Sequence, residues 1–136
     1  MTTDKKKCPL CQNDETITHL YQCQHRENWR QQMMDNLHKF LNKQKTPADI
    51  ATSMKSYITT RFQNPIIYQH VNTFLIFAGL LPISWRQHMT YQSNHSVANR
   101  WATQISNWMV NQGHSLWMVR NKSIDEDSTK YTQASQ

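Results

Sequence analysis

Glycine and proline are scarce in this chain of 136 residues, which contains two glycines and four prolines. All-β sandwiches and barrels need frequent tight turns built from these residues, so the scarcity disfavours both architectures. The apolar residues suffice for a modest core, with five Trp, seven Met, five Tyr and four Phe. We therefore expect an all-α fold of long helices with short connections.

The chain also lacks an apolar run long enough to cross a membrane. Its longest apolar stretch, residues 74–83, has about half the length that a spanning helix needs, and Gly79 and Pro82 interrupt it. Residues 1–7 are polar and end in three lysines, unlike a secretory signal. We expect no membrane contact and an intracellular protein, for which the nucleus is one fitting location.

Acidic residues are few. Nine Asp and Glu stand against fifteen Lys and Arg, which gives a formal net charge of +6 at pH 7. An excess of positive charge favours a polyanionic partner, either RNA or DNA. Three consecutive lysines would supply phosphate contacts, namely Lys5, Lys6 and Lys7.

Sequence signatures of catalysis are missing. The chain has no Tyr-x-Asp-Asp motif, and its acidic residues form no cluster that would hold two metal ions. No serine or cysteine nucleophile stands near a histidine–carboxylate pair. Histidines beyond the first 30 residues are scattered along the chain, at positions such as His38, His70, His88 and His114. We therefore expect no enzyme activity.

The three cysteines all lie within the first 23 residues, and their odd number argues against a self-contained disulfide framework. Two residues separate Cys8 from Cys11, the spacing with which a tight turn directs two thiolates at one metal. His19 and Cys23 are four residues apart, which places both side chains on one face of a helix. The pattern Cys-x2-Cys-x7-His-x3-Cys thus predicts one zinc ion bound by Cys8, Cys11, His19 and Cys23.

Two alternatives to this site remain open. His25 is a competing nitrogen ligand, but its two-residue offset from Cys23 suits a helix less well than the position of His19. A redox-active Cys-x-x-Cys pair would need a preceding strand and a parallel sheet beyond, for which the sequence offers no pattern. Four protein ligands leave no place for a catalytic water, so we expect a structural site whose metal binding is coupled to local folding.

Helical patterns begin next to the cysteines. Asp14, Glu15 and Thr16 offer capping oxygens for a short helix that carries His19 and Cys23, and Leu20 and Tyr21 should pack this helix against the rest. Residues 27–43 show helical apolar spacing at Trp29, Met33, Leu37, Phe40 and Leu41.

Further helix starts and stops follow along the chain. Thr46 as a cap, Pro47 at the first helical position and Asp49 in a capping box predict the next helix. Residues 66–78 should form another helix that stops at Gly79. Pro82 should open a helix with Trp85 and Met89 in the core, and Ser96 should cap a last long helix whose apolar arc is Val97, Trp101, Ile105, Trp108, Met109, Leu116 and Val119.

These patterns divide the chain into three parts. We expect a small Cys3His zinc knuckle in residues 1–25 and a bundle of about five helices in residues 26–122. Residues 123–136 are low in apolar content and include three consecutive acidic residues, so we expect a disordered tail there.

The knuckle resembles a known family. The run Cys8-Pro9-Leu10-Cys11, the acidic pair Asp14-Glu15 and the run Thr18-His19-Leu20-Tyr21-Gln22-Cys23 are similar to the zinc-binding segment that follows the polymerase domain in non-LTR retrotransposon reverse transcriptases. Residues 79–92, with Ile83-Ser84-Trp85, and residues 116–121 resemble the helical region downstream of that segment more loosely.

The resemblance implies ligand roles for the same three cysteines and His19, with the element's RNA or target DNA as partner. It also implies that the chain works with other domains of a larger retroelement protein. Because the polymerase and endonuclease signatures are missing, no catalytic activity is carried over. The resulting hypothesis is a non-catalytic, nucleic-acid-binding accessory module; the alternative is a zinc-stabilised helical domain that binds another protein.

Overall fold

The structure, a computed structural model, describes the backbone of residues 8, 10–11, 16–68 and 70–134, and their side chains except at 17, 71–72 and 123–134. These residues form helices and no strand. The elements in chain order are α1 (Ile17–Gln22), the 3-10 helix η1 (Gln24–Arg26), α2 (Glu27–Lys43), α3 (Ala48–Gln63), the 3-10 helix η2 (Val71–Ala78), α4 (Ile83–Gln92) and α5 (His95–Ala134). The predicted all-α fold with an N-terminal Cys3His group is confirmed.

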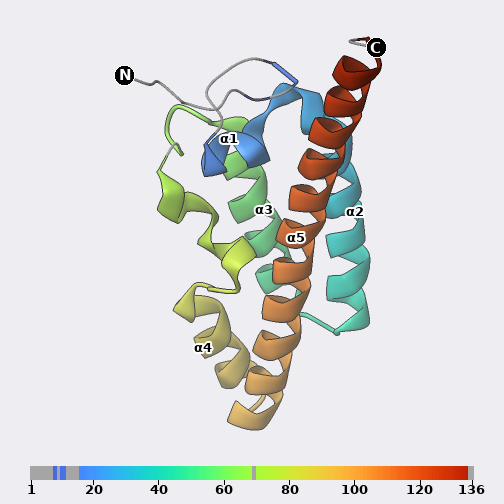
Figure 1. The fold of residues 1–136 in the computed structure, drawn as a ribbon. Coiled ribbons are helices and arrows are strands. Elements are labelled where there is room, and N and C mark those ends of the chain that lie inside the picture. Colours follow the sequence, from blue (N-terminus) through green and yellow to red (C-terminus); the bar gives the residue numbers. More distant parts are fainter. Residues whose placement is uncertain (1–7, 9, 12–15, 69, 135–136) are drawn as a thin grey trace.

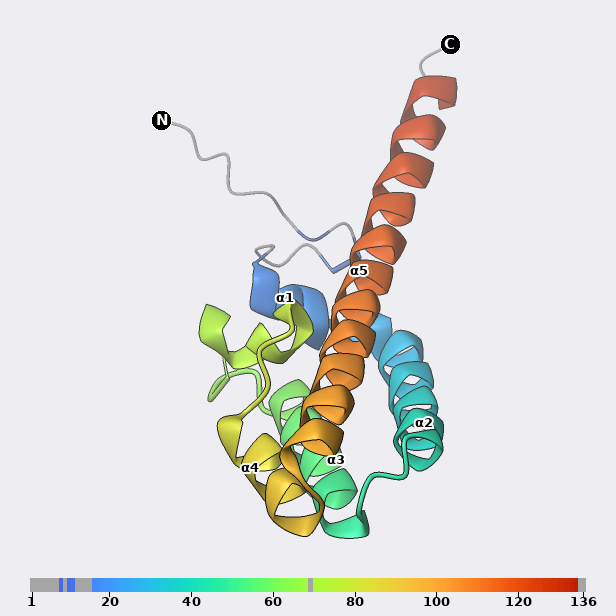
Figure 2. The same cartoon turned by 90° about the horizontal axis from the view of Figure 1, so that it is seen from below.

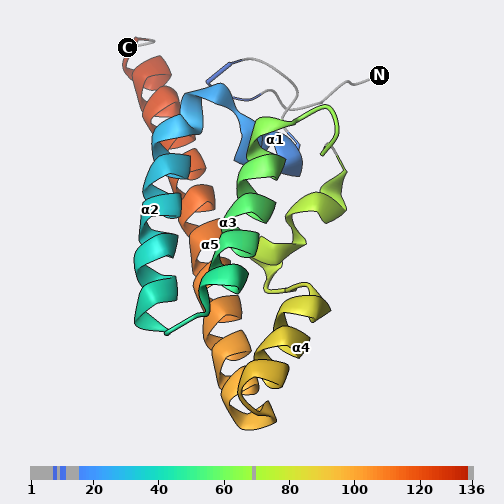
Figure 3. The same ribbon diagram turned by 180° about the vertical axis from the view of Figure 1, so that it is seen from behind.

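Helices α2, α3 and α5 lie side by side and form the body of the molecule (Figure 1). The view from behind shows α3 next to α2, with α5 on their far side (Figure 3). Helix α4 packs against the first turns of α5 at one end of the body, and α1 packs against α3, η2 and α5 at the other. At its C-terminal end α5 continues past the other helices (Figure 2).

One hydrophobic core joins all the main helices. It contains side chains spaced three or four apart on each helix, including Met33, Leu37 and Leu41 of α2 and Met54 and Ile58 of α3. The predicted bounds 27–43 agree with α2, and the predicted buried positions Trp85 and Met89 of α4 are confirmed. An apolar stripe at helical spacing therefore sufficed to locate these faces.

Tyr21 connects the short helix α1 to this core. Its ring stacks on Phe74 and on Phe77, with centroid separations of 4.6 Å in both cases. Gly113 of α5 makes the approach possible, because a Cβ atom there would lie 3.1 Å from the Tyr21 hydroxyl oxygen. The predicted packing of Tyr21 and Leu20 against the body is confirmed.

The predicted start of α3 is wrong in its details. The helix begins at Ala48, and Pro47 precedes it with an extended ψ of 145°. Thr46 does not cap the helix, because its hydroxyl accepts a hydrogen bond of 2.8 Å from the indole N–H of Trp101. Asp49 Oδ1 instead accepts from the N–H of Ile50. A partner 55 residues away in the chain has replaced the local cap.

The predicted helix over residues 66–78 is also wrong. Among the residues described in this range, the helical ones are Val71–Ala78, which form a 3-10 helix with a kink at Phe74, where φ is −112° and ψ is 25°. The kinked segment sends both Phe74 and Phe77 to the ring of Tyr21. The predicted stop at Gly79 is confirmed, since this residue has a left-handed φ of 91°.

Helix α5 differs from its prediction at both ends. Asn94, not Ser96, caps it, because Asn94 Oδ1 accepts a hydrogen bond from the N–H of Val97. The backbone is helical through Ala134, whereas a disordered tail was predicted for residues 123–136; no glycine or proline interrupts residues 123–134. Val97 and Val119 were expected in the core but are 39% and 41% exposed. No helix in the described part of the chain is both long and apolar enough to span a bilayer.

Candidate metal centre

The four predicted ligands meet at one point beside α1. One donor atom each from Cys8, Cys11, His19 and Cys23 lies within 4.8 Å of the other three. Within the described ranges, this is the one group of three or more Cys, His, Asp or Glu side chains that are so close together. Residues from a turn and from a helical end thus converge as their spacing predicted.

The separations between the donor atoms fit a tetrahedral ion. The sulfur of Cys23 lies 3.9 Å from that of Cys8 and 3.8 Å from that of Cys11. A disulfide would need about 2.05 Å, whereas two sulfurs on one tetrahedral zinc lie roughly 3.8 Å apart. Cys11 Sγ and His19 Nε2 are 3.1 Å apart, somewhat less than the roughly 3.5 Å of such a site. The donor set fits a metal that prefers sulfur and imidazole ligands.

Helix α1 positions two of the four ligands. Thr16 caps it, as predicted, because its hydroxyl oxygen accepts a hydrogen bond of 3.0 Å from the N–H of His19. Cys23 ends the helix and donates its backbone N–H to the carbonyl of His19 at 2.8 Å. One helical turn therefore separates the imidazole from the sulfur. The other predicted capping residues, Asp14 and Glu15, lie outside the described residues.

Burial and backbone donors act on the cysteine thiols. Cys8 and Cys23 are each 1% exposed, and Cys11 is half-buried. Burial raises the pKa of the Cys23 thiol to about 11. Burial also acts to raise the pKa of Cys8, but hydrogen bonds from the backbone N–H groups of Leu10 and Cys11 and from the neighbouring thiols of Cys11 and Cys23 together hold that pKa below its usual 9.0. Amide dipoles directed at a sulfur stabilise its thiolate, the form that binds a metal.

The two candidate histidines are separated by the fold. His19 brings its ring nitrogen to the sulfurs, whereas His25 is exposed and lies outside the group. The geometry therefore favours His19 as the nitrogen donor. Its advantage is the four-residue spacing to Cys23 along one helical turn.

Arg30 of α2 supports the ligand-bearing helix, a role that no sequence pattern predicted. Its Nη1 donates to the carbonyl oxygens of Tyr21 at 3.1 Å and Cys23 at 2.7 Å. Its Nη2 donates to Glu27 Oε2 at 2.7 Å. This buried guanidinium satisfies carbonyls at the C-terminus of α1, which a helix leaves unpaired. The Glu27–Arg30 spacing was the only local sign of it.

Arg26 ends η1, three residues after Cys23, and is 3% exposed. Its Nε and Nη1 atoms are buried without a hydrogen-bond partner in the described part of the chain. An unpaired buried donor is costly. Arg26 therefore contributes a destabilising feature beside the metal centre.

Residues outside the Cys3His group were also candidates for binding. The Trp85 side chain is buried and its indole N–H donates to Ser53 Oγ at 3.2 Å, so the core interpretation of Trp85 is confirmed over base stacking. His88 Nε2 lies 2.6 Å from Asp49 Oδ2 in an exposed pair that links α4 to α3. The nucleic-acid contacts predicted for Lys5, Lys6 and Lys7 lie outside the described residues and stay a prediction.

Comparisons of the chain with known protein families, with curated proteins and with solved structures found no match. The resemblance to non-LTR retrotransposon reverse transcriptases thus stays an expectation from the sequence.

Proposed function

We propose that the chain is a non-catalytic module that binds one zinc ion through Cys8, Cys11, His19 and Cys23. The observation that carries the proposal is the convergence of three sulfurs and one imidazole at tetrahedral spacing. Bound zinc would cross-link Cys8 and Cys11 to α1, and α1 packs into the core through Tyr21. Four protein ligands would fill the coordination sphere, which is typical of a structural site.

Metal analysis of protein purified without added zinc tests this proposal. We expect one zinc per chain and, after exchange, the absorption of Co²⁺ in a tetrahedral thiolate site. His19→Ala should lower the zinc content, and His25→Ala, the matched control, should leave it unchanged. A metal-free chain that keeps α1 folded while all three thiols react freely would refute the proposal.

The partner that we propose for this module is RNA or DNA, within a larger reverse transcriptase-like retroelement protein. The net charge of +6 and the three lysines directly before Cys8 support this choice. A metal ion bound to Cys8 would hold the C-terminal end of that lysine segment in one place. The resemblance of the knuckle to the retrotransposon segment supports the same partner.

Salt-dependent binding distinguishes this partner from others. Each phosphate contact contributes about −0.9 to the slope of log K against log salt on duplex DNA. Replacing Lys5, Lys6 and Lys7 by alanine should therefore flatten the slope by about 2 to 3. The control replaces three other lysines, namely Lys39 and Lys43 of α2 and Lys45 in the turn after it. Equal slopes for wild type and the first variant would contradict the proposed contact.

Exposed aliphatic side chains favour a second candidate function, docking of another protein. Ile66 and Ile67, which are neighbours in the chain, are 83% and 72% exposed, and Ile83 is 72% exposed. Large aliphatic side chains that stay in water can contact another protein. The test is competition by unlabelled polyanion at rising salt. If all binding to nucleic acid is lost at moderate salt while a protein partner stays bound, the result favours this second function.

A further inference from the structure

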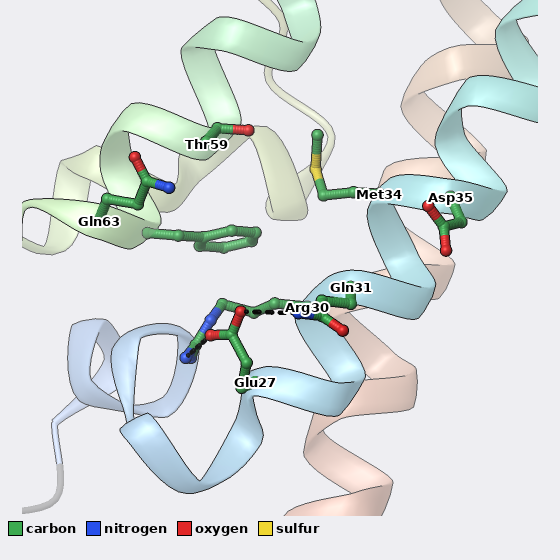
Figure 4. A pocket seen from close by; sticks show the side chains of 8 residues that line it. Glu27, Arg30, Gln31, Met34, Asp35, Thr59 and Gln63 are labelled. Carbon is green, nitrogen blue, oxygen red and sulfur yellow. Dashed lines mark hydrogen bonds and ion pairs between the residues drawn. The ribbon is translucent and has the colours of Figure 1, made fainter.

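A cavity of about 500 Å³ lies between α2 and α3, close to the metal centre. This volume is within the range of about 300–1,000 Å³ that is typical of ligand sites. Figure 4 shows its two walls: Glu27, Gln31 and Asp35 follow one another along α2, and Thr59 and Gln63 project from α3. Met34 and Phe62 add apolar lining.

The polar lining of this cavity combines two carboxylates with neutral groups. Asp35 is exposed, and its carboxylate makes no hydrogen bond or ion pair with the residues that the structure describes. Carboxylates only accept hydrogen bonds at neutral pH, whereas the side chains of Gln31, Thr59 and Gln63 can each donate and accept. The Asp35 carboxylate therefore favours a ligand that carries donors and positive charge, and the neutral groups can supply further acceptors.

The one cation in the lining is already in use. Arg30 donates to two backbone carbonyls and to Glu27, and its guanidinium carbon lies 5.9 Å from the centre of the Phe62 ring. With two carboxylates and one guanidinium, the lining has a net charge of −1. A phosphate would meet repulsion there, although the chain as a whole is basic.

We propose that this cavity binds the side chain of an arginine presented by a partner protein. The guanidinium offers five N–H donors in a plane, which suit the Asp35 carboxylate and the neutral amide acceptors. Its aliphatic stem would lie against Met34 and Phe62, where Arg30 already shows a guanidinium near the same ring. The site goes beyond the proposed zinc and nucleic-acid functions and does not depend on them.

The test uses the full zinc-loaded chain with ¹³C-labelled methionine methyls. Met34 lines the cavity, and the buried Met33 serves as an internal reference. We expect N-acetyl-arginine amide to shift the Met34 signal, with a dissociation constant on the order of millimolar. N-acetyl-citrulline amide has nearly the same shape without the charge and should bind about ten-fold more weakly.

Two variants locate the binding. Asp35→Asn should weaken the arginine amide about ten-fold, and Asp49→Asn, which removes the same charge elsewhere, should not. An unchanged Met33 signal establishes that both variants are folded. The proposal is overturned if the arginine amide causes no shift, if citrulline binds equally well, or if Asp35→Asn has no effect. It is also overturned if cytidine, whose amino group can donate to a carboxylate, fills the site and the arginine amide does not.

Discussion

Replacing Arg30 by methionine should weaken the metal centre without touching a ligand. Methionine keeps much of the apolar stem but removes all donors. The carbonyl oxygens of Tyr21 and Cys23 then lose the Nη1 contacts of 3.1 and 2.7 Å. Glu27 loses an ion pair in which its own side chain is 58% exposed.

The magnitude follows from the burial of these groups. A hydrogen bond to a charged donor contributes about 1.5–3 kcal/mol. The half-exposed ion pair with Glu27 adds at most about 1 kcal/mol. The two bonds and the ion pair together contribute roughly 3–7 kcal/mol. Apolar contacts of the new methionine offset part of this, so we expect Arg30→Met to lower the free energy of unfolding by about 3–5 kcal/mol. Because one lost contact holds the backbone of the ligand Cys23, zinc affinity should fall about 10- to 100-fold.

Two measurements separate these effects. Urea unfolding of the zinc-loaded chain gives the free energy of unfolding, and competition with a chelator of known affinity gives the zinc affinity. Arg86→Met is the matched control, because Arg86 is exposed and donates to Asn99 on the opposite end of the body. This control should change neither quantity by more than about 0.5 kcal/mol.

A loss of stability without a loss of zinc affinity would contradict this role of Arg30. Suppose that Arg30→Met lowers the free energy of unfolding by about 2 kcal/mol or more, as expected for a buried arginine, but binds zinc within about two-fold of wild type. Arg30 then stabilises the helical body alone. The hydrogen bond to Cys23 would then have no part in positioning the ligand.

Three other changes test separate features of the fold. Gly113→Ala should lower the melting temperature despite a gain in helix propensity of about 1 kcal/mol, because the new methyl would lie 3.1 Å from the hydroxyl oxygen of Tyr21; a higher melting temperature would contradict the close packing. Arg26→Met should raise the free energy of unfolding by about 1–3 kcal/mol, since it removes two buried unpaired donors, and urea titration at constant zinc measures it. The hydrogen bond from His88 holds the pKa of Asp49 below its usual 3.8. The pair therefore stabilises the fold above pH 3.8, and this stabilisation is lost as the pH falls through the lowered pKa of Asp49. His88→Ala should move the carboxyl pKa of Asp49 up towards 3.8, as measured by an NMR titration.

Features that depend on residues close together in the chain could be predicted from the sequence alone. The ligand spacing predicted which four side chains meet, and His19 rather than His25 has the helical offset that brings its ring to the sulfurs. The apolar period predicted the bounds of α2. In both cases helical geometry fixes the direction of side chains three or four positions apart, whatever the rest of the chain does.

Features in which distant groups compete for one side chain depend on the folded arrangement and could not be predicted locally. Thr46 has the right position for a cap, but the indole of Trp101 uses its hydroxyl instead. Residues 66–78 show apolar positions at helical spacing before a glycine stop, yet stacking on Tyr21 accompanies a kinked 3-10 segment there. Arg30 looks like a solvated position of α2 until the end of α1 places two carbonyls beside it. Such partners are 7 to 55 residues away in the chain, and local propensities of a few tenths of a kcal/mol are too small to outweigh a buried hydrogen bond or a stacked ring.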